Sequence, residues 1–254
     1  MPAEKSAQEI AVEELRKHGA FFKTAGLFEL FLEYPETEEL KRIRKESFYL
    51  SFNEKDWKNV KQWTGGREKL KYLRDLPTLR EVSLYGPNFT DEWCEELDHL
   101  PQLEGLFFSG KSLTDRGLAH VSKLTNLKAL SLLDTSISDN GMRYLKELKH
   151  LRWLSLSGTN VTDAGLVHLR ELTNLEDLSL EGTETTREGL THLKGLTKLR
   201  RVRLASSLLL PEKPAGLGPL AGMTDLRKLD ARGLAVTDDE LKVVRNMTAL
   251  SEET

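Results

Sequence analysis

The residues of this sequence with the clearest capacity for chemistry are its histidines and its single cysteine. His120, His168 and His192 share one position of a repeated pattern, so adjacent helices could bring two imidazoles together as a metal pair. No column of carboxylates completes such a site. Cys94 and His99 are five residues apart, which suits neither a zinc pair nor a nucleophile with its base. We interpret the histidines as exposed polar positions and expect no metal.

Serines also recur at regular positions, and a serine becomes a nucleophile when a histidine lies beside it. The recurring residues are Ser83, Ser131, Ser155 and Ser179. None lies in a G-x-S-x-G motif, and no histidine is placed to act as a base. The sequence also lacks a P-loop, a dinucleotide-binding fingerprint and an H-E-x-x-H motif. We therefore predict a protein that is not an enzyme and has no cofactor.

The element that positions every candidate residue is a repeated unit, which is clearest at 148–171. Leu154 and Leu156 have the two-residue spacing of a short strand, and Thr162 followed by Asp163 is typical of a helix start. A threonine oxygen accepts a hydrogen bond from the first-turn amides, and an aspartate favours the positive end of the helix dipole. Each unit is therefore predicted to be one strand, one turn and one short helix.

Two columns of large apolar residues repeat this unit along most of the chain, in steps of 24 residues with one step of 27. The first column is Leu76, Leu100, Leu124, Leu148, Leu172, Leu196, Met223 and Met247, and the second is Leu79, Leu103, Leu127, Leu151, Leu175, Leu199, Leu226 and Leu250. Ordering one unit costs about 24 to 48 kcal/mol of backbone entropy, and burying its apolar side chains contributes roughly 10 to 20 kcal/mol. The units must therefore stack, with parallel strands.

The first 75 residues are expected to form an N-terminal cap with a degenerate first repeat. Apolar spacing predicts a helix over 9–18, strands over 20–23 and 28–34, and the first strand of the repeat sheet over 47–53. Eleven of the 18 aromatic residues precede residue 76, which suits covering the end of a stack, although a ligand pocket is the alternative. Residues 76–254 then hold seven full copies and a truncated eighth.

Composition limits the classes of partner. The chain has 254 residues and a net charge of -3, so it shows no global attraction for nucleic acid. No apolar run approaches the roughly 20 residues that span a bilayer, and the charged N-terminus lacks a signal-peptide core. The only cysteine, Cys94, fits a reducing compartment. We expect a cytoplasmic protein that binds neither nucleic acid nor membranes.

The pattern LxxLxxLxLxxTxxTDxGLxxLxx, as in LTNLKALSLLDTSISDNGMRYLKE from Leu124, resembles leucine-rich repeats. It is similar in particular to the 24-residue repeats of planctomycete-like bacteria and to those of F-box substrate receptors. The segment IAVEELRKHGAFF also looks like the cap helix and strand of those bacterial proteins. The resemblance implies an α/β solenoid, or horseshoe, with a parallel concave sheet, short convex helices and an N-terminal cap. It also implies that the concave surface binds other macromolecules.

Strand residues that alternate with the leucines are expected to point outward onto the concave surface, in three rows. The first row is Glu81, Gly105, Ala129, Trp153, Asp177, Arg201 and Lys228; the second is Ser83, Phe107, Ser131, Ser155, Ser179, Arg203 and Asp230; the third is Tyr85, Ser109, Leu133, Ser157, Glu181, Ala205 and Arg232. The rows divide into an apolar half around Trp153 and a charged half around Arg203.

Aromatic residues and arginine dominate binding hot spots, so these rows supply the candidate binding residues. They are Tyr85, Phe107, Leu133 and Trp153 in the apolar half, and Asp177, Glu181, Arg201, Arg203 and Arg232 in the charged half. We expect Trp153 to be displayed on a solvated sheet and to contact a protein partner. The charged half has an alternative interpretation as surface ion pairs, Asp177 with Arg201 and Arg203 with Asp230, each contributing only about 0 to 1 kcal/mol.

Residues 205–222 interrupt the pattern, because the sixth repeat loses its Thr-Asp helix start and gains three residues and three prolines. Leu209, within a run of three leucines, is a second candidate contact, since irregular repeats often carry contacts. A tolerated insertion is the alternative.

These features predict a non-catalytic scaffold that binds a protein partner through the concave sheet. The F-box resemblance implies an alternative, a substrate-recognition adaptor in a protein-modification or turnover assembly. Lys228, Asp230 and Arg232 place charges on the last full strand, which disfavours pairing between sheet edges. We therefore expect a monomer.

Overall fold

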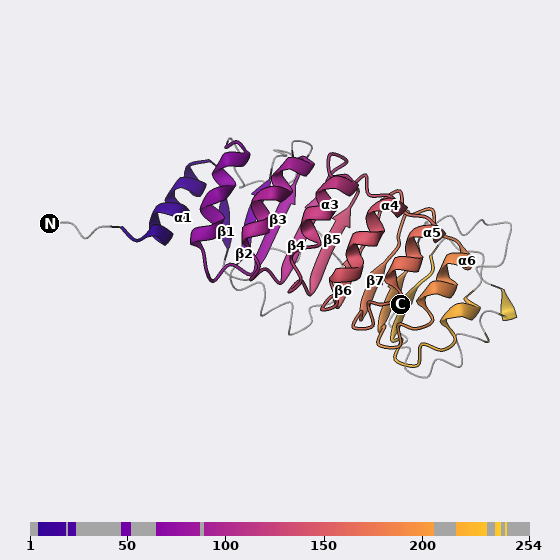
Figure 1. Cartoon of the computed structure of the whole chain (residues 1–254). Helices are drawn as coiled ribbons and strands as arrows, with labels where there is room; N and C mark the ends of the chain where they lie inside the picture. Colours follow the sequence, from indigo (N-terminus) through magenta and orange to yellow (C-terminus); the bar gives the residue numbers. More distant parts are fainter. Residues whose placement is uncertain are drawn as a thin grey trace.

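The computed structural model describes residues 5–18, 20–23, 47–51, 65–86, 89–205, 217–232, 237–239 and 242. Its strands form one sheet in which each strand lies beside the one before it in sequence, from β1 to β9. Figure 1 shows the repeats as an elongated stack, with the indigo helix α1 at one end and the orange and yellow units at the other. The predicted α/β solenoid is confirmed.

The sheet is parallel apart from its first pair. β1 (Phe21–Lys23) runs antiparallel to β2 (Ser47–Ser51), which confirms the strands expected over 20–23 and 47–53. The strands that follow are β3 (Glu81–Tyr85), β4 (Gly105–Ser109), β5 (Ala129–Leu133), β6 (Trp153–Ser155), β7 (Asp177–Ser179), β8 (Arg201–Arg203) and β9 (Lys228–Asp230). The strand predicted over 28–34 lies outside the described residues.

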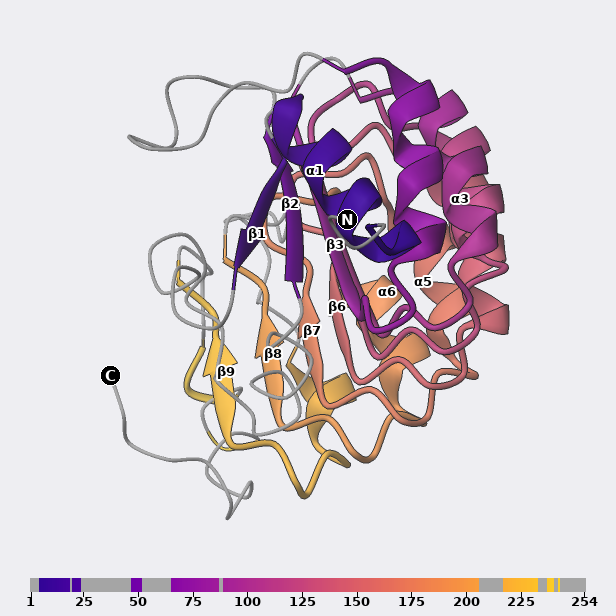
Figure 2. The same ribbon diagram turned by 90° about the vertical axis from the view of Figure 1, so that its left-hand side faces the viewer.

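Short helices cover the other side of the sheet, so Figure 2 shows two layers. The α-helices are α1 (Ala7–Lys17), α3 (Asp115–Val121), α4 (Asp139–Met142), α5 (Asp163–Leu166) and α6 (Arg187–Leu190). The 3₁₀ helices are η3 (Arg67–Asp75), η4 (Asp91–His99), η5 (Arg143–Glu147), η6 (Val167–Leu169), η7 (Thr191–Leu193) and η8 (Gly218–Leu220). Paired strands lie about 4.8 Å apart, whereas packed helices need roughly 8 to 10 Å, so the stack curves with the sheet inside.

The two columns of repeat leucines fill the space between these layers. From Leu76 to Leu226 every member of both columns is at most 4% exposed, as the periodicity predicted. Met247 and Leu250 lie outside the described residues. The strand residues Val82, Leu84 and Leu106 complete the same core, and the residues between them point to the opposite face.

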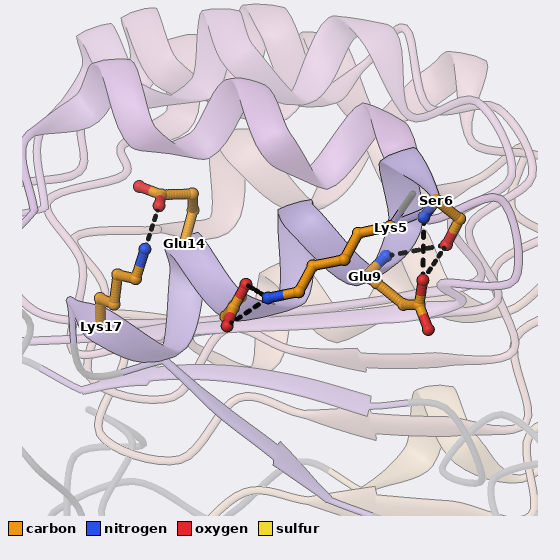
Figure 3. Close-up of polar contacts among 6 residues, drawn as sticks. Lys5, Ser6, Glu9, Glu14 and Lys17 are labelled. Carbon is orange, nitrogen blue, oxygen red and sulfur yellow. Dashed lines mark hydrogen bonds and ion pairs between the residues drawn. The ribbon is translucent and has the colours of Figure 1, made fainter. Parts of the chain in front are cut away.

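Helix α1 begins two residues before the predicted helix over 9–18, because Ser6 forms a capping box with Glu9 (Figure 3). The Ser6 hydroxyl accepts a hydrogen bond from the Glu9 amide at 3.3 Å, and the Ser6 amide donates to the Glu9 carboxylate at 2.8 Å. The Ser6 hydroxyl also donates to the Glu9 carboxylate at 3.0 Å, and the two bonds that this carboxylate accepts from Ser6 lower the pKa of Glu9. Ala11 and Leu15 are buried, and α1 packs against η3.

The aspartate of each Thr-Asp pair joins one repeat to the next. Oδ1 of Asp139 accepts from the amide of Thr162 at 2.8 Å, and Oδ2 accepts from its hydroxyl at 2.6 Å. The Thr162 hydroxyl in turn accepts from the Ala164 amide, which confirms the predicted helix cap. The same contacts join Asp91 to Thr114, Asp115 to Ser138, and Asp163 to Thr186. We call this set the aspartate ladder.

The aspartate ladder explains why glycine occupies the last position of the T-D-x-G motif. A Cβ atom on Gly165 would lie 2.4 Å from Oδ1 of Asp139, which is closer than real Cβ contacts come. Gly141 and Gly189 have the same relation to Asp115 and Asp163, at 2.3 and 2.1 Å. The threonine, the aspartate and the glycine are therefore one interlocking unit that spans two repeats.

Replacing Asp139 with alanine should lower the free energy of unfolding by about 2 to 4 kcal/mol, because two hydrogen bonds to a charged acceptor are lost. Equilibrium denaturation in urea measures the change. Asp134→Asn is the matched control: Asp134 is exposed, and its φ of 53° is one that asparagine tolerates. The control should change stability by less than about 0.5 kcal/mol. Equal losses in both variants would contradict the ladder.

Candidate functional site

The inner sheet surface carries the three predicted rows, because the residues between core leucines all emerge on one side. Strand pairing aligns the rows across neighbouring strands, as in Ala129 with Trp153 and Ser131 with Ser155. Exposure differs between the rows. From β3 to β7 the first two rows are buried, including Glu81 and Ser83 at 0%, whereas the third row reaches solvent.

The prediction that Trp153 is displayed to solvent is wrong. Trp153 is only 4% exposed, and Phe107 is 2% exposed. Their rings stack with centroids 5.8 Å apart and an interplanar angle of 29°. Ala129 completes this small apolar cluster on the inner surface, and the half-buried Tyr85 packs against it. Trp153 therefore has an apolar packing site of its own on the sheet.

Small neighbours explain how the Trp153 indole reaches Phe107. Trp153 pairs with Ala129 on β5, and Ala129 pairs with Gly105 on β4. Neither small residue fills the space above its own strand, so the indole can cross β5 and reach Phe107 on β4. The signal in the sequence was the Gly105 and Ala129 pair that precedes Trp153 in the first row.

The charged half contains a compact group that we call the Asp177 cluster, formed by Asp177, Arg201 and Arg203. Nη1 of Arg201 donates to Oδ2 of Asp177 at 3.1 Å, and Nη2 of Arg203 lies 3.8 Å from Oδ1. The pairing of Asp177 with Arg201 is confirmed, but it is not a surface pair. The exposed fractions of the three side chains are 9% for Asp177, 21% for Arg201 and 12% for Arg203.

Burial raises the pKa of Asp177 to about 6, although the charges of Arg201 and Arg203 act in the opposite direction. In the first row, Asp177 on β7 is the register partner of Trp153 on β6 and of Arg201 on β8. The low exposure of Asp177 and of the two arginine side chains beside it accounts for this effect of burial.

A chain of hydroxyls lies beside the Asp177 cluster. The hydroxyl oxygens of Ser155 and Ser157 are 3.1 Å apart, and those of Ser157 and Ser179 are 2.8 Å apart. Ser179 pairs with Arg203 across β7 and β8. These three serines therefore form a polar strip between the aromatic residues and the arginines.

The predicted ion pair between Arg203 and Asp230 is not the arrangement found. The two residues are register partners on β8 and β9, but Asp230 accepts hydrogen bonds from Arg232, the closest at 2.7 Å. Arg203 instead approaches Asp177. These bonds from Arg232 lower the pKa of Asp230. Arg232 is local to the turn after β9, so it reaches Asp230 without crossing between strands.

The accessible part of the inner surface lies along the ends of the strands. Tyr85 and Leu133 are half-buried, and Glu181 and Arg232 are exposed. Each of these four candidate residues has solvent-exposed surface, and Arg201 and Arg203 are exposed in part. Leu209 and most of the 205–222 insertion lie outside the described residues.

The residues first considered for chemistry are dispersed. Nδ1 of His120 is 3.3 Å from Asp98, and His192 contacts Arg170. Cys94 is buried, which raises the pKa of its thiol well above the usual value. Among the described residues, no group of three or more histidine, cysteine, aspartate or glutamate side chains is arranged to hold a metal ion. No helix in the described part of the chain is long and apolar enough to cross a membrane.

Solved structures with this architecture include two internalins. Internalin C2 from Listeria monocytogenes superposes with a TM-score of 0.57 at 24% identity, covering 72% of this chain and 72% of that one. Internalin F from the same organism superposes with a TM-score of 0.52 at 23% identity, covering 84% of this chain and 61% of that one. The chain has the leucine-rich-repeat fold.

A third structure, the leucine-rich-repeat ectodomain of the Arabidopsis receptor kinase HAESA in complex with a peptide hormone, gives a TM-score of 0.46 at 21% identity. It covers 61% of this chain and 26% of that one. No protein-family model matches the sequence, and no curated protein matches it. The shared property is the leucine-rich-repeat architecture, so function must be argued from the residues of the inner surface.

Because Trp153 is buried, alanine at this position should destabilise the leucine-rich-repeat sheet by about 3 to 5 kcal/mol. Thermal and urea unfolding followed by circular dichroism measure the loss. Leu133→Ala, on the adjacent strand but half-buried, is the control and should cost about 1 kcal/mol. A Trp153 variant as stable as the control would show that the indole is not packed.

Asp177 should make stability depend on pH. The unfolded chain ionises this carboxyl near pH 3.8 and the folded chain near 6, so the folded state holds more protons between these values. Stability from this group is present below pH 3.8 and is lost as the pH rises through about 6. The free energy of unfolding of the wild type, minus that of Asp177→Asn, should fall by roughly 1 to 3 kcal/mol between pH 4 and 7. A constant or rising difference would contradict the raised pKa.

Proposed function

We propose that this chain is a non-catalytic scaffold that binds a protein partner through the inner surface of its sheet. The observation that carries the proposal is the accessible third row. It displays Tyr85 and Leu133 beside the exposed Glu181, on strands whose other side chains are packed. Apolar contacts next to charged ones are the composition of a protein-recognition surface with an anchoring centre and a polar rim.

The dimensions of this row suit a protein segment. From Tyr85 at the end of β3 to Glu181 just after β7 there are four strand steps, or about 19 Å at the usual spacing. That length accommodates roughly six residues of extended chain or a few turns of helix. The buried layer beneath the row, which includes Trp153 and Asp177, holds the strands in place before a partner arrives. Binding would therefore require little ordering of the scaffold.

Within the described residues, mostly small residues follow the strands of this row. Gly86, Gly110, Gly158 and Gly182 have positive φ angles, and Asp134 occupies the equivalent position on β5. A Cβ atom on Gly110 would lie 2.8 Å from the carbonyl oxygen of Gly86, so the turns must approach one another closely. A partner can then approach the strand ends over these mostly small turn residues.

We also propose an oligomeric state and a cellular compartment for this chain. The last described strand, β9, presents the charged Lys228 and Asp230, which disfavours pairing with another sheet, and we propose a monomer. The single cysteine suits a reducing compartment, and we propose the cytoplasm. We propose that the chain binds neither nucleic acid nor a membrane, since the net charge is only -3.

Leu133→Glu should reduce capture of the native partner at least about tenfold, because a charge would face the apolar part of the interface. Leu133 is half-buried at a strand end, so the variant should retain its circular dichroism spectrum and unfolding midpoint within a few degrees. Affinity capture from the native source, followed by a binding assay with the recovered protein, measures the effect.

Asn140→Glu is the matched control, because it adds the same charge in the same repeat on an exposed position of α4. It should bind like the wild type. Equal capture by all three proteins would refute a partner site on the inner surface. Recurrent recovery of a modifying enzyme with the wild type would instead favour the adaptor role that the F-box resemblance implies.

A further inference from the structure

The aspartate ladder stops between the fifth and sixth repeats. Its last contact is that of Asp163, whose two carboxylate oxygens accept from the amide and the hydroxyl of Thr186, each at 2.6 Å. One repeat later the aspartate position holds Arg187, which is a donor and cannot accept these bonds. In the sequence, the equivalent threonine and aspartate positions of the sixth repeat are Leu210 and Pro211, which have neither a hydroxyl nor a carboxylate. Neither junction after the fifth repeat can therefore form a ladder contact.

An arginine also occupies the aspartate position at the other end of the ladder, but its contacts differ. Arg67 lies 24 residues before Asp91, and its guanidinium joins η3 to η4. Nη1 of Arg67 donates to the carbonyl oxygen of Glu92 at 3.2 Å, and Nη2 lies 3.0 Å from the carboxylate of Glu95. The side chain of Arg187 is exposed and makes no hydrogen bond or ion pair with any described residue. Of these two arginines, only the N-terminal one links its unit to the next.

The sheet side of the same junction carries the Asp177 cluster. Oδ1 of Asp177 and Nε of Arg201 are buried and have no hydrogen-bond partner among the described residues, which lowers stability. Burial raises the pKa of Asp177 to about 6 despite the arginines beside it, so their attraction does not fully offset the cost of removing the carboxylate from water. Between β5 and β6, by contrast, the first-row residues are Ala129 and Trp153 of the apolar cluster. The junction of β7 with β8 therefore lacks a stabilising contact on the helix side and has an incompletely matched one on the sheet side.

Backbone hydrogen bonds do not distinguish this junction from the one before it. The amide of Leu180 donates to the carbonyl oxygen of Arg203 on β8 at 2.9 Å. One repeat earlier, the amide of Leu156 donates to the carbonyl oxygen of Ser179 on β7, also at 2.9 Å. Leu196, in the leucine column of the sixth repeat, is fully buried. The difference between the two junctions therefore lies in their polar side chains.

We propose that the chain has a built-in boundary between the fifth and sixth repeats, across which β8, η8 and β9 open from the stack while β3 to β7 stay folded. Units of a solenoid contact only their neighbours, so one weak junction divides a single cooperative unit into two. Arg201, Arg203 and Arg232 lie on the side that opens, whereas Tyr85 and Leu133 do not. Opening therefore changes the charged part of the inner surface and leaves the apolar part in place. It needs no partner, so it can occur whether or not the chain is a binding scaffold.

Native-state hydrogen exchange of the full chain, resolved by residue with nuclear magnetic resonance, tests the boundary. The amides of Arg201 and Leu180 donate across β7 and β8, and we call them the boundary amides. The amides of Asp177 and Leu156 donate the equivalent bonds across β6 and β7 at the same two lengths, 3.0 and 2.9 Å, and serve as reference amides. After correction for intrinsic exchange rates, the boundary amides should be at least about thirtyfold less protected, because the ladder contact to a charged acceptor is missing. The amide of Trp153, which donates across β5 and β6, should match the reference amides within about threefold.

A variant tests whether the ladder sets the position of this step in protection. Asp163→Ala removes the last ladder contact, so the reference amides should become as poorly protected as the boundary amides, while the amide of Trp153 stays protected. Glu184→Gln is the matched control, because Glu184 is exposed in the same repeat and its side chain makes no hydrogen bond or ion pair with any described residue. This control should leave the step between β7 and β8.

Three results would overturn the boundary. They are equal protection of the boundary and reference amides in the wild type, a gradual decline in protection from Trp153 to Arg201 as in simple fraying from the end, and a step that stays in place in a folded Asp163→Ala variant. Circular dichroism checks that each variant folds. If Asp163→Ala does not fold, the comparison of the two sets of amides in the wild type decides the question by itself.

Discussion

Hydrogen bonds from Thr162 to Asp139, and their equivalents in neighbouring repeats, connect units that cannot fold alone. Each aspartate holds the start of the next helix at a fixed distance, so the strands that precede those helices stay in register across the sheet. The same contact excludes any side chain at the following glycine, such as Gly165. The ladder ends where Arg187 takes the aspartate position, immediately before the irregular sixth repeat.

The inner surface has a packed floor and an accessible rim, which changes where binding is expected. Trp153 and Phe107 belong to the floor, where they support the strands, and Leu133 and Glu181 belong to the rim. The Asp177 cluster lies between these parts. It is buried enough for its electrostatic interactions to be strong, yet its arginines retain access to the surface.

The resemblance to internalin C2 and internalin F concerns the solenoid, at 24% and 23% identity. A likeness at this identity concerns the fold alone, so it carries no information about the outward residues of the sheet. In this chain the outward residues differ along the sheet, since Phe107 on β4 and Trp153 on β6 are aromatic, whereas Asp177 on β7 and Arg201 on β8 are charged. A partner that spans the surface would therefore meet two kinds of chemistry.

The sequence by itself determined the repeat unit, the parallel strand order and which face of each strand is core, because a 24-residue period and two-residue alternation are local patterns. Only the tertiary structure decided which outward residues reach solvent. Whether the Trp153 ring can stack on Phe107 depends on the small Ala129 on the strand between them. Asp177 and its two arginines are largely buried, although the strand sequences alone predicted a surface pair. Exposure on a curved sheet is a property of neighbouring strands, and no single strand encodes it.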